Sequence, residues 1–115
     1  MARLIWTEPA LGDLEAIAEV IALDKPGAAR DFVRKVFRSA ERLTALPNSG
    51  RRPPETPGLP YRELIVRPCR IFYRVRDRDV FIVYVMRSEQ LLHPDTLEER
   101  SRDLGRSPRK PGNGA

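Results

Sequence analysis

The sequence contains few of the residues on which catalytic and metal sites most often depend. Its 115 residues include one cysteine, Cys69, and one histidine, His93. A single cysteine excludes an intramolecular disulfide framework, and no cluster of Cys and His has metal-ligand spacing. Gly-rich phosphate loops are also missing from the sequence. We therefore expect neither a metal nor a cofactor, and a reducing cytoplasm is the simplest compartment.

Long apolar runs are missing as well. No stretch approaches the roughly 18 apolar residues that suggest a membrane span. The first fifteen residues include Glu8, Asp13 and Glu15, which occupy the region where a signal peptide needs its apolar segment. We expect a protein that does not enter the membrane and whose mature chain begins near Met1.

Positive charge is plentiful and unevenly distributed along the chain. The formal net charge is +5. Residues 1–50 are balanced, with seven basic and seven acidic side chains, whereas residues 51–87 carry nine basic and four acidic ones. Residues 88–100 are acidic and residues 101–115 are basic. A localised basic surface attracts either phosphate or an acidic protein, and the sequence leaves both open.

The first half of the chain predicts a strand followed by two helices. Ala2–Trp6 is apolar enough for one strand, and Thr7 is a plausible N-cap. Apolar residues then recur at helical spacing over Glu8–Leu23. A short break at residues 24–27, with Asp24 or Lys25 as the next cap, leads into a helix of about twenty residues that stops before Pro47. Such a short turn favours an antiparallel hairpin.

The second half predicts a loop and three strands. Residues 47–60 contain five prolines and two glycines, which is typical of a connector. β-branched and aromatic residues then dominate 61–66, 69–76 and 80–86. We expect an α+β fold: an N-terminal strand, a two-helix antiparallel hairpin and a three-stranded antiparallel meander, which form one sheet packed on the helices. The first strand is expected to pair beside the last.

Alternation along the strands assigns their two faces. Ile71, Tyr73 and Val75 are predicted to meet the helices, together with Tyr84. The opposite face is predicted to be open, basic and aromatic. It receives a protein segment or a nucleic acid, or its arginines merely keep the face soluble. The candidate contacts for a target or partner protein are Arg51, Arg52, Arg62, Arg70, Phe72, Arg74 and Arg87.

No pair of a nucleophile and a base is evident. His93 precedes a proline and is predicted to be a turn residue. Carboxylates for acid–base chemistry would have to come from Glu63, Asp77, Asp79 and Glu89, of which Asp77 and Asp79 belong to a hairpin turn. The remaining chemistry is that of arginines, which can hold phosphate and stabilise developing charge.

The chain beyond residue 93 is predicted to lie outside the domain. We place the domain at residues 1–93 and a C-terminal extension at residues 94–115. Asp95–Leu104 has the spacing of a short helix, and the Pro, Gly and Arg content of residues 105–115 is typical of a disordered basic tail.

Several motifs in this order resemble the RelE/ParE superfamily of type II toxin–antitoxin toxins. The resemblance covers about residues 3–88. It rests on Trp6 before the first helix with Ala10 and Asp13-Leu14 opening it, on Pro26, Ala29 and Phe32 opening the second, on Leu46-Pro47 with Gly50-Arg51, and above all on YREL at 61–64 and RIFYRV at 70–75. It implies a small sheet on a helical hairpin and a bacterial, plasmid-stabilising toxin. It also implies a cognate ParD-like antitoxin that wraps the toxin in a hetero-oligomer.

The superfamily contains ribosome-dependent messenger RNA endonucleases and ParE-like proteins that inhibit DNA gyrase. In the nuclease reading, Arg62, Arg70 and Arg87 would hold the scissile phosphate. However, Leu64 stands where nucleases usually have a second lysine, Ser88 stands where a late arginine is expected, and no tyrosine follows it. The resemblance therefore favours the ParE-like branch, which needs no catalytic residue. The nuclease and an inactive toxin fold that survives as a binding partner remain alternatives.

Overall fold

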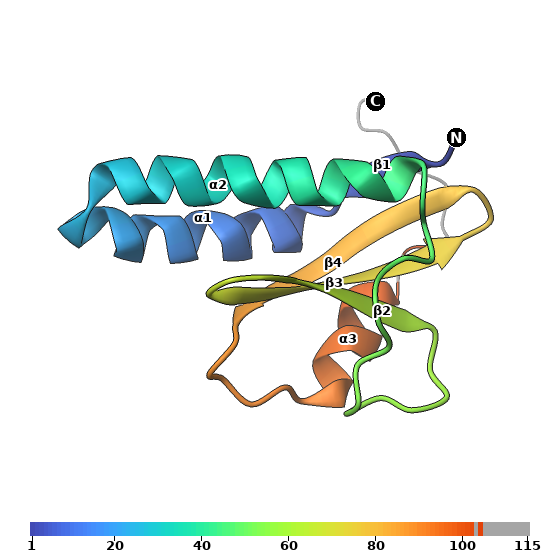
Figure 1. The fold of residues 1–115 in the computed structure, drawn as a ribbon. Coiled ribbons are helices and arrows are strands. Elements are labelled where there is room, and N and C mark those ends of the chain that lie inside the picture. The colour runs from blue at the N-terminus through green and yellow to red at the C-terminus, as the bar shows by residue number, and fades with distance from the viewer. Residues whose placement is uncertain (103, 105–115) are drawn as a thin grey trace, which may run out of the picture.

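A computed structural model describes residues 1–102 and 104 of the chain. The architecture is the predicted α+β fold, with a helical hairpin on one face of a single sheet and a third helix on the other (Figure 1). The elements in chain order are β1 (Arg3–Trp6), α1 (Glu8–Asp24), α2 (Pro26–Glu41), the 3₁₀ turn η1 (Arg42–Thr44), β2 (Tyr61–Val66), β3 (Cys69–Arg76), β4 (Asp79–Arg87) and α3 (Pro94–Ser101). The predicted tail at residues 105–115 lies outside the described residues.

The hairpin begins and turns for local reasons. Thr7 is the N-cap of α1, as predicted, because its Oγ1 accepts the Ala10 N–H at 3.3 Å. Only Lys25 separates the helices, and Pro26 starts α2 at a position where its missing N–H costs nothing. α2 is shorter than predicted, with 16 residues, because η1 tightens the last turn.

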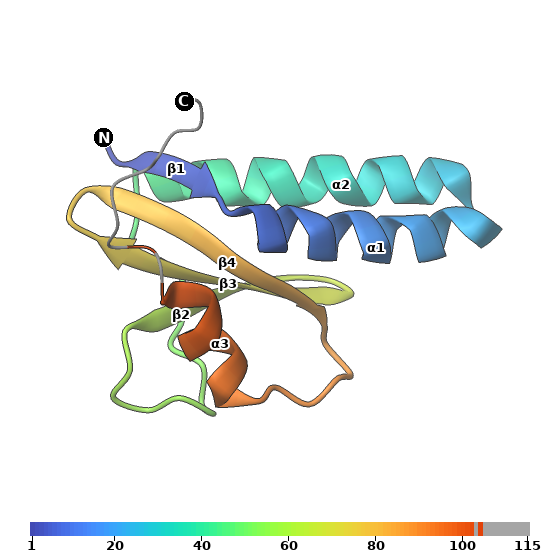
Figure 2. The ribbon, with the colours of Figure 1, turned by 180° about the vertical axis from the view of Figure 1, so that it is seen from behind.

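The sheet has the strand order β1-β4-β3-β2. β1 runs parallel to β4, with Arg3 opposite Asp79 and Trp6 opposite Ile82, and the other pairs are antiparallel. Figure 2 shows how β1 leads directly into α1. β4 is therefore a central strand, which explains why both of its faces are apolar.

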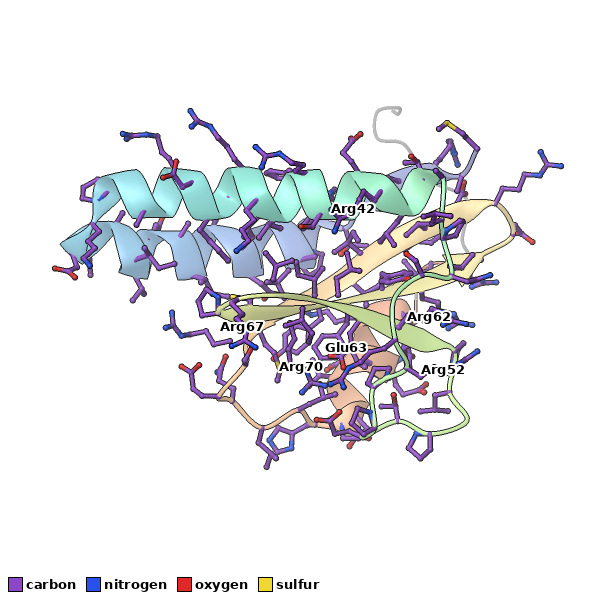
Figure 3. All side chains as sticks on the ribbon, in the orientation of Figure 1. Arg42, Arg52, Arg62, Glu63, Arg67 and Arg70 are labelled. Carbon is purple, nitrogen blue, oxygen red and sulfur yellow. The ribbon has the colours of Figure 1, made fainter. Side chains whose placement is uncertain are left out.

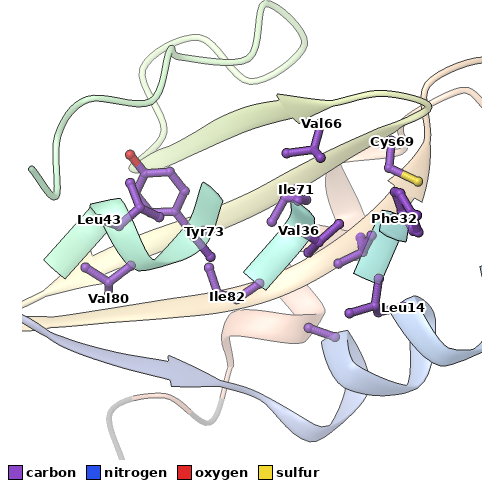
Figure 4. Close-up of a cluster of buried hydrophobic side chains, with 13 residues drawn as sticks. Leu14, Phe32, Val36, Leu43, Val66, Cys69, Ile71, Tyr73, Val80 and Ile82 are labelled. Atoms are coloured by element: carbon purple, nitrogen blue, oxygen red, sulfur yellow. The ribbon is translucent and has the colours of Figure 1, made fainter. Parts of the chain in front are cut away.

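The larger core lies between the hairpin and the sheet (Figure 4). Phe32 and Val36 of α2 pack there with Leu14 of α1, and Ile71 and Tyr73 of β3 meet them from the sheet. The assignment of Ile71, Tyr73 and Val75 to the helix side is confirmed.

A bulge in β4 changes the face of the residues that follow it. Phe72 pairs with Tyr84 while Tyr73 pairs with Ile82, so that Val83 is an extra residue in β4. One extra residue reverses the alternation. Tyr84 thus lies on the side opposite the hairpin, where its ring stacks on Phe72 with centroids 5.8 Å apart. The prediction that Tyr84 faces the helices is wrong for this reason.

A second, smaller core covers that opposite side. Tyr61, Phe72, Val83 and Met86 of the sheet pack there against the apolar side chains that lead into α3 and lie within it, Leu92 and Leu97. The prediction of an open face is therefore wrong: Phe72 is completely buried.

Candidate functional site

Four charged side chains form a network on the α3 side of the sheet. Arg70 of β3 donates from Nε to Oε1 of Glu63 at 2.6 Å, and both of its terminal nitrogens donate to Glu55 at 2.8 Å. Glu63 also accepts from Nε of Arg51 at 2.6 Å through Oε2. Figure 3 shows Glu63 and Arg70 together beneath the sheet. The network joins β2 and β3 to the connector at residues 47–60.

Burial makes this network unlike a surface ion pair. The side chain of Glu63 is fully buried and that of Arg70 is 10% exposed. The hydrogen bonds that Arg70 donates to Glu55 and Glu63 raise the pKa of Arg70 although burial opposes this, and the bonds that Glu55 accepts from Arg70 lower the pKa of Glu55. The guanidinium lies 4.9 Å from the centre of the Phe72 ring, which occupies one of its faces. Arg70 is therefore charged, buried and bound through each of its three nitrogens, and the prediction that it is offered outward is wrong.

The three arginines of the nuclease hypothesis are not brought together. Arg62 lies on the opposite face of β2 from Glu63, beside Tyr73, and donates to the Gly50 carbonyl at 2.9 Å. Arg87 ends β4 and pairs with Glu89 at 2.9 Å. Arg62 and Arg70 thus point to different sides of the sheet, which corrects the prediction that both face outward on one side.

The other predicted contacts are more accessible. Arg51 has a side chain that is 60% exposed, although its Nε is bound to Glu63. Arg52 is exposed and donates to the Leu59 carbonyl at 2.8 Å, which fixes the connector. Arg74 is half-buried on the α3 side, and within residues 1–102 its Nε has no hydrogen-bond partner.

The tyrosines and the histidine do not form an acid–base pair with these arginines. The Tyr73 hydroxyl accepts the Gly50 N–H and donates to the Pro47 carbonyl, both at 2.8 Å, and burial raises its pKa. A Cβ on Gly50 would lie 2.6 Å from that hydroxyl, so the close approach requires glycine. His93 is exposed at the N-cap of α3. Tyr73 therefore anchors the connector.

A second polar cluster, which the sequence did not predict, holds α3 in place. Arg100 forms two hydrogen bonds to Asp13 of α1, at 2.9 and 3.0 Å, and one to the Val83 carbonyl at 2.9 Å. Asp13 also accepts the Val85 N–H at 3.1 Å. β1 pairs with β4 only as far as Ile82, so these two side chains satisfy the bulged edge of β4 beyond it.

Glu55, Asp13 and Arg100 were not predicted as site residues, and Glu63 was considered only as a candidate acid or base, not as the partner of Arg70. The signal for Glu63 was an acid in the middle of a strand, diagonal to an arginine in the next strand. No comparable local signal existed for Asp13 and Arg100, which are 87 residues apart.

The comparisons with known proteins agree with this geometry. Residues 4–92 match the family model of the ParE toxin of the type II toxin–antitoxin system parDE. The chain belongs to the ParE toxin family. Among its relatives, a Caulobacter vibrioides protein named toxin RelE2 is 35% identical over 92 residues, which is 79% of this chain and all of that protein.

A solved structure supports the same family assignment. A chain of the chromosomal ParDE toxin–antitoxin system from P. aeruginosa superposes with a TM-score of 0.67 and 30% identity, over 77% of this chain and 98% of that one. The chain is thus a toxin of the RelE/ParE superfamily, whose systems pair each toxin with an antitoxin. None of the described helices could cross a membrane, and no group of potential metal ligands occurs among the residues described.

Proposed function

We propose that this toxin inhibits DNA gyrase without catalysing a reaction of its own, acts in the cytoplasm and is neutralised by a ParD-like antitoxin. The observation that carries the proposal is the state of Arg70. A phosphate-holding arginine must offer accessible donors, whereas the side chain of Arg70 is only 10% exposed and all three of its nitrogens already donate to Glu55 and Glu63. A nuclease would in addition need an acid or a base beside the phosphate.

The contact surface for the target follows from accessibility. Arg51, Arg52 and Arg74 border the connector and the α3 side, and Arg87 begins the C-terminal segment. We assign direct contact to these four residues and to the segment from Arg87 onward. Arg70 and Phe72 support that surface from beneath. Arg62 lies on the other face of the sheet. We therefore assign it to contact with the antitoxin and not with the target.

A supercoiling assay tests the proposal. Purified toxin added to gyrase should reduce supercoiling or accumulate cleaved DNA, and the cognate antitoxin should restore activity. Replacing Arg52 and Arg87 with alanine should weaken inhibition, whereas Arg38→Ala, a matched change on α2, should not. Full supercoiling in the presence of a stoichiometric excess of folded toxin would exclude gyrase as the target.

The nuclease alternative requires a separate test. Cleavage of messenger RNA on translating ribosomes by the wild-type toxin would favour it. Arg70→Ala is a poor probe, because it removes a buried partner of two carboxylates and lowers stability whatever the activity. Arg62→Ala and Arg87→Ala change more accessible side chains. Loss of cleavage in both would identify a nuclease, and no cleavage by the wild type would support the proposal made above.

A further inference from the structure

The helical hairpin has an apolar groove that no described part of the chain fills. It lies between α1 and α2 and has a volume of about 770 Å³. Ala18, Val33 and Phe37 line it, and Phe37 is 37% exposed, while Leu11 at one end is 40% exposed. α1 thus has two apolar stripes, one against the sheet and one along the groove. A continuous apolar surface of this kind marks an interaction site.

The two rims of the groove carry opposite charges. Glu15 and Glu19 of α1 form one rim, and Arg30 and Arg34 of α2 form the other. The asymmetry extends along the helices: the charged residues of α1 are all acidic, namely Glu8, Asp13, Glu15, Glu19 and Asp24. Among residues 1–102, no ion pair joins the acidic rim to the basic rim. Arg34 does pair with Asp31 of its own helix at 3.7 Å, but both side chains are exposed and such a pair is weak, so each rim still offers charge to an external partner.

We propose that the toxin, when it is free of antitoxin, forms a symmetric dimer through this groove. A two-fold axis along the groove places α1 of one copy over α2 of the other. Glu15 and Glu19 of each copy then face Arg30 and Arg34 of its partner, at both rims at once. The surface is thus complementary to itself, as an isologous interface requires. Neighbouring helices of the four then run antiparallel, and they pack around Ala18, Val33 and Phe37 of both copies.

The size of the hairpin sets an upper limit on the strength of such an interface. The 16 residues of α2 span about 24 Å, and two packed helices are about 20 Å wide, which gives an outline of about 480 Å². Standard interfaces bury about 800 Å² per partner, so we expect a weak dimer whose formation depends on concentration. Apolar contact supplies most of the affinity, and the rims select the orientation. This inference does not depend on the cellular target of the toxin.

Charge reversal tests the dimer directly. The variant Glu15→Arg with Glu19→Arg has two basic rims, and the variant Arg30→Glu with Arg34→Glu has two acidic rims. Each should be monomeric in analytical ultracentrifugation at low salt, because like charges would face each other. An equimolar mixture should form a heterodimer of twice the 13.2 kDa mass of the chain. The variant with all four substitutions should dimerise alone.

The control keeps the charge change but moves it away from the groove. Lys35→Glu with Arg38→Glu alters α2 by the same amount and should leave the dimer intact. Circular dichroism should show native helix content in all variants. A monomeric wild-type toxin, or a monomeric mixture of the two reversed variants, would overturn the proposal. A third outcome would also contradict the dimer. If the wild-type toxin were monomeric at every concentration and Phe37→Glu weakened its binding to the antitoxin, the groove would be an antitoxin site only.

Discussion

At the scale of single residues, Glu63 is the centre of the charge network. It lies between Arg51 and Arg70, and its side chain is completely buried. Glu63→Ala should lower the free energy of unfolding by about 3–5 kcal/mol, because it removes a buried carboxylate and leaves the Nε of buried Arg70 with no acceptor, although Glu55 still binds the two terminal nitrogens. Urea unfolding measures this loss. The matched change Glu89→Ala breaks the ion pair of Arg87 with a glutamate that is 65% exposed, and it should cost much less because water screens an exposed pair. Equal losses would mean that the network is only a surface feature.

Glu55 makes the stability of the protein depend on pH through the same network. Hydrogen bonds from Arg70 lower its pKa below the ordinary value of 4.5. In the window between the lowered pKa and 4.5, the unfolded chain binds more protons at this position than the folded one, so stability rises with pH. The contribution is complete above 4.5 and is lost as pH falls through the folded pKa. Urea midpoints over this window should therefore fall less in Glu55→Gln than in the wild type.

The control for this pH dependence is Glu98→Gln. Glu98 is exposed on α3 and belongs to no ion pair among the described residues. This variant should lose stability in acid as steeply as the wild type. If Glu55→Gln and the wild type lost stability in parallel, the bond between Glu55 and Arg70 would not contribute to acid sensitivity.

At the scale of elements, the sequence predicted strands and helices well because each has a local pattern. The bounds of β2 and β3 match the predicted 61–66 and 69–76, and the N-cap at Thr7 was predicted correctly. The faces were harder to predict. A single bulge at Val83 places Tyr84 on the far side, and strand alternation contains no signal for a bulge.

No local pattern in the sequence predicts that α3 covers the face of the sheet opposite the hairpin. Alternation along the strand places Arg70 on the face opposite the hairpin, and the sequence predicts that this face is open. The partners of Arg70 come from the same strand region and from the connector, and the burial of Phe72 depends on Leu97, 25 positions further along the sequence. The sequence thus predicts an open basic sheet, whereas the structure shows a buried ion network bordered by accessible arginines.

At the scale of the whole molecule, two cores of unequal size share one sheet. The core under the hairpin includes residues from two helices and all four strands, whereas the core under α3 depends on Leu92, Leu97 and the bonds of Arg100. An isolated helix of eight residues is unstable in water, so α3 should unfold whenever it leaves the sheet. We expect α3 to open in a step of lower free energy than global unfolding.

Native-state hydrogen exchange can separate these two steps. Amides of α3 should exchange with a smaller opening free energy than those of β3 and β4, which require global unfolding. Leu97→Ala should lower the opening free energy of α3 by about 2–5 kcal/mol, and Leu91→Ala, at a position that is 76% exposed, should leave it unchanged. Val36→Ala, in the larger core, should lower the exchange free energy of β4 but not that of α3, because its contacts persist when α3 is open. Equal exchange free energies in α3 and β4, lowered together by Val36→Ala, would show that the two cores unfold as one.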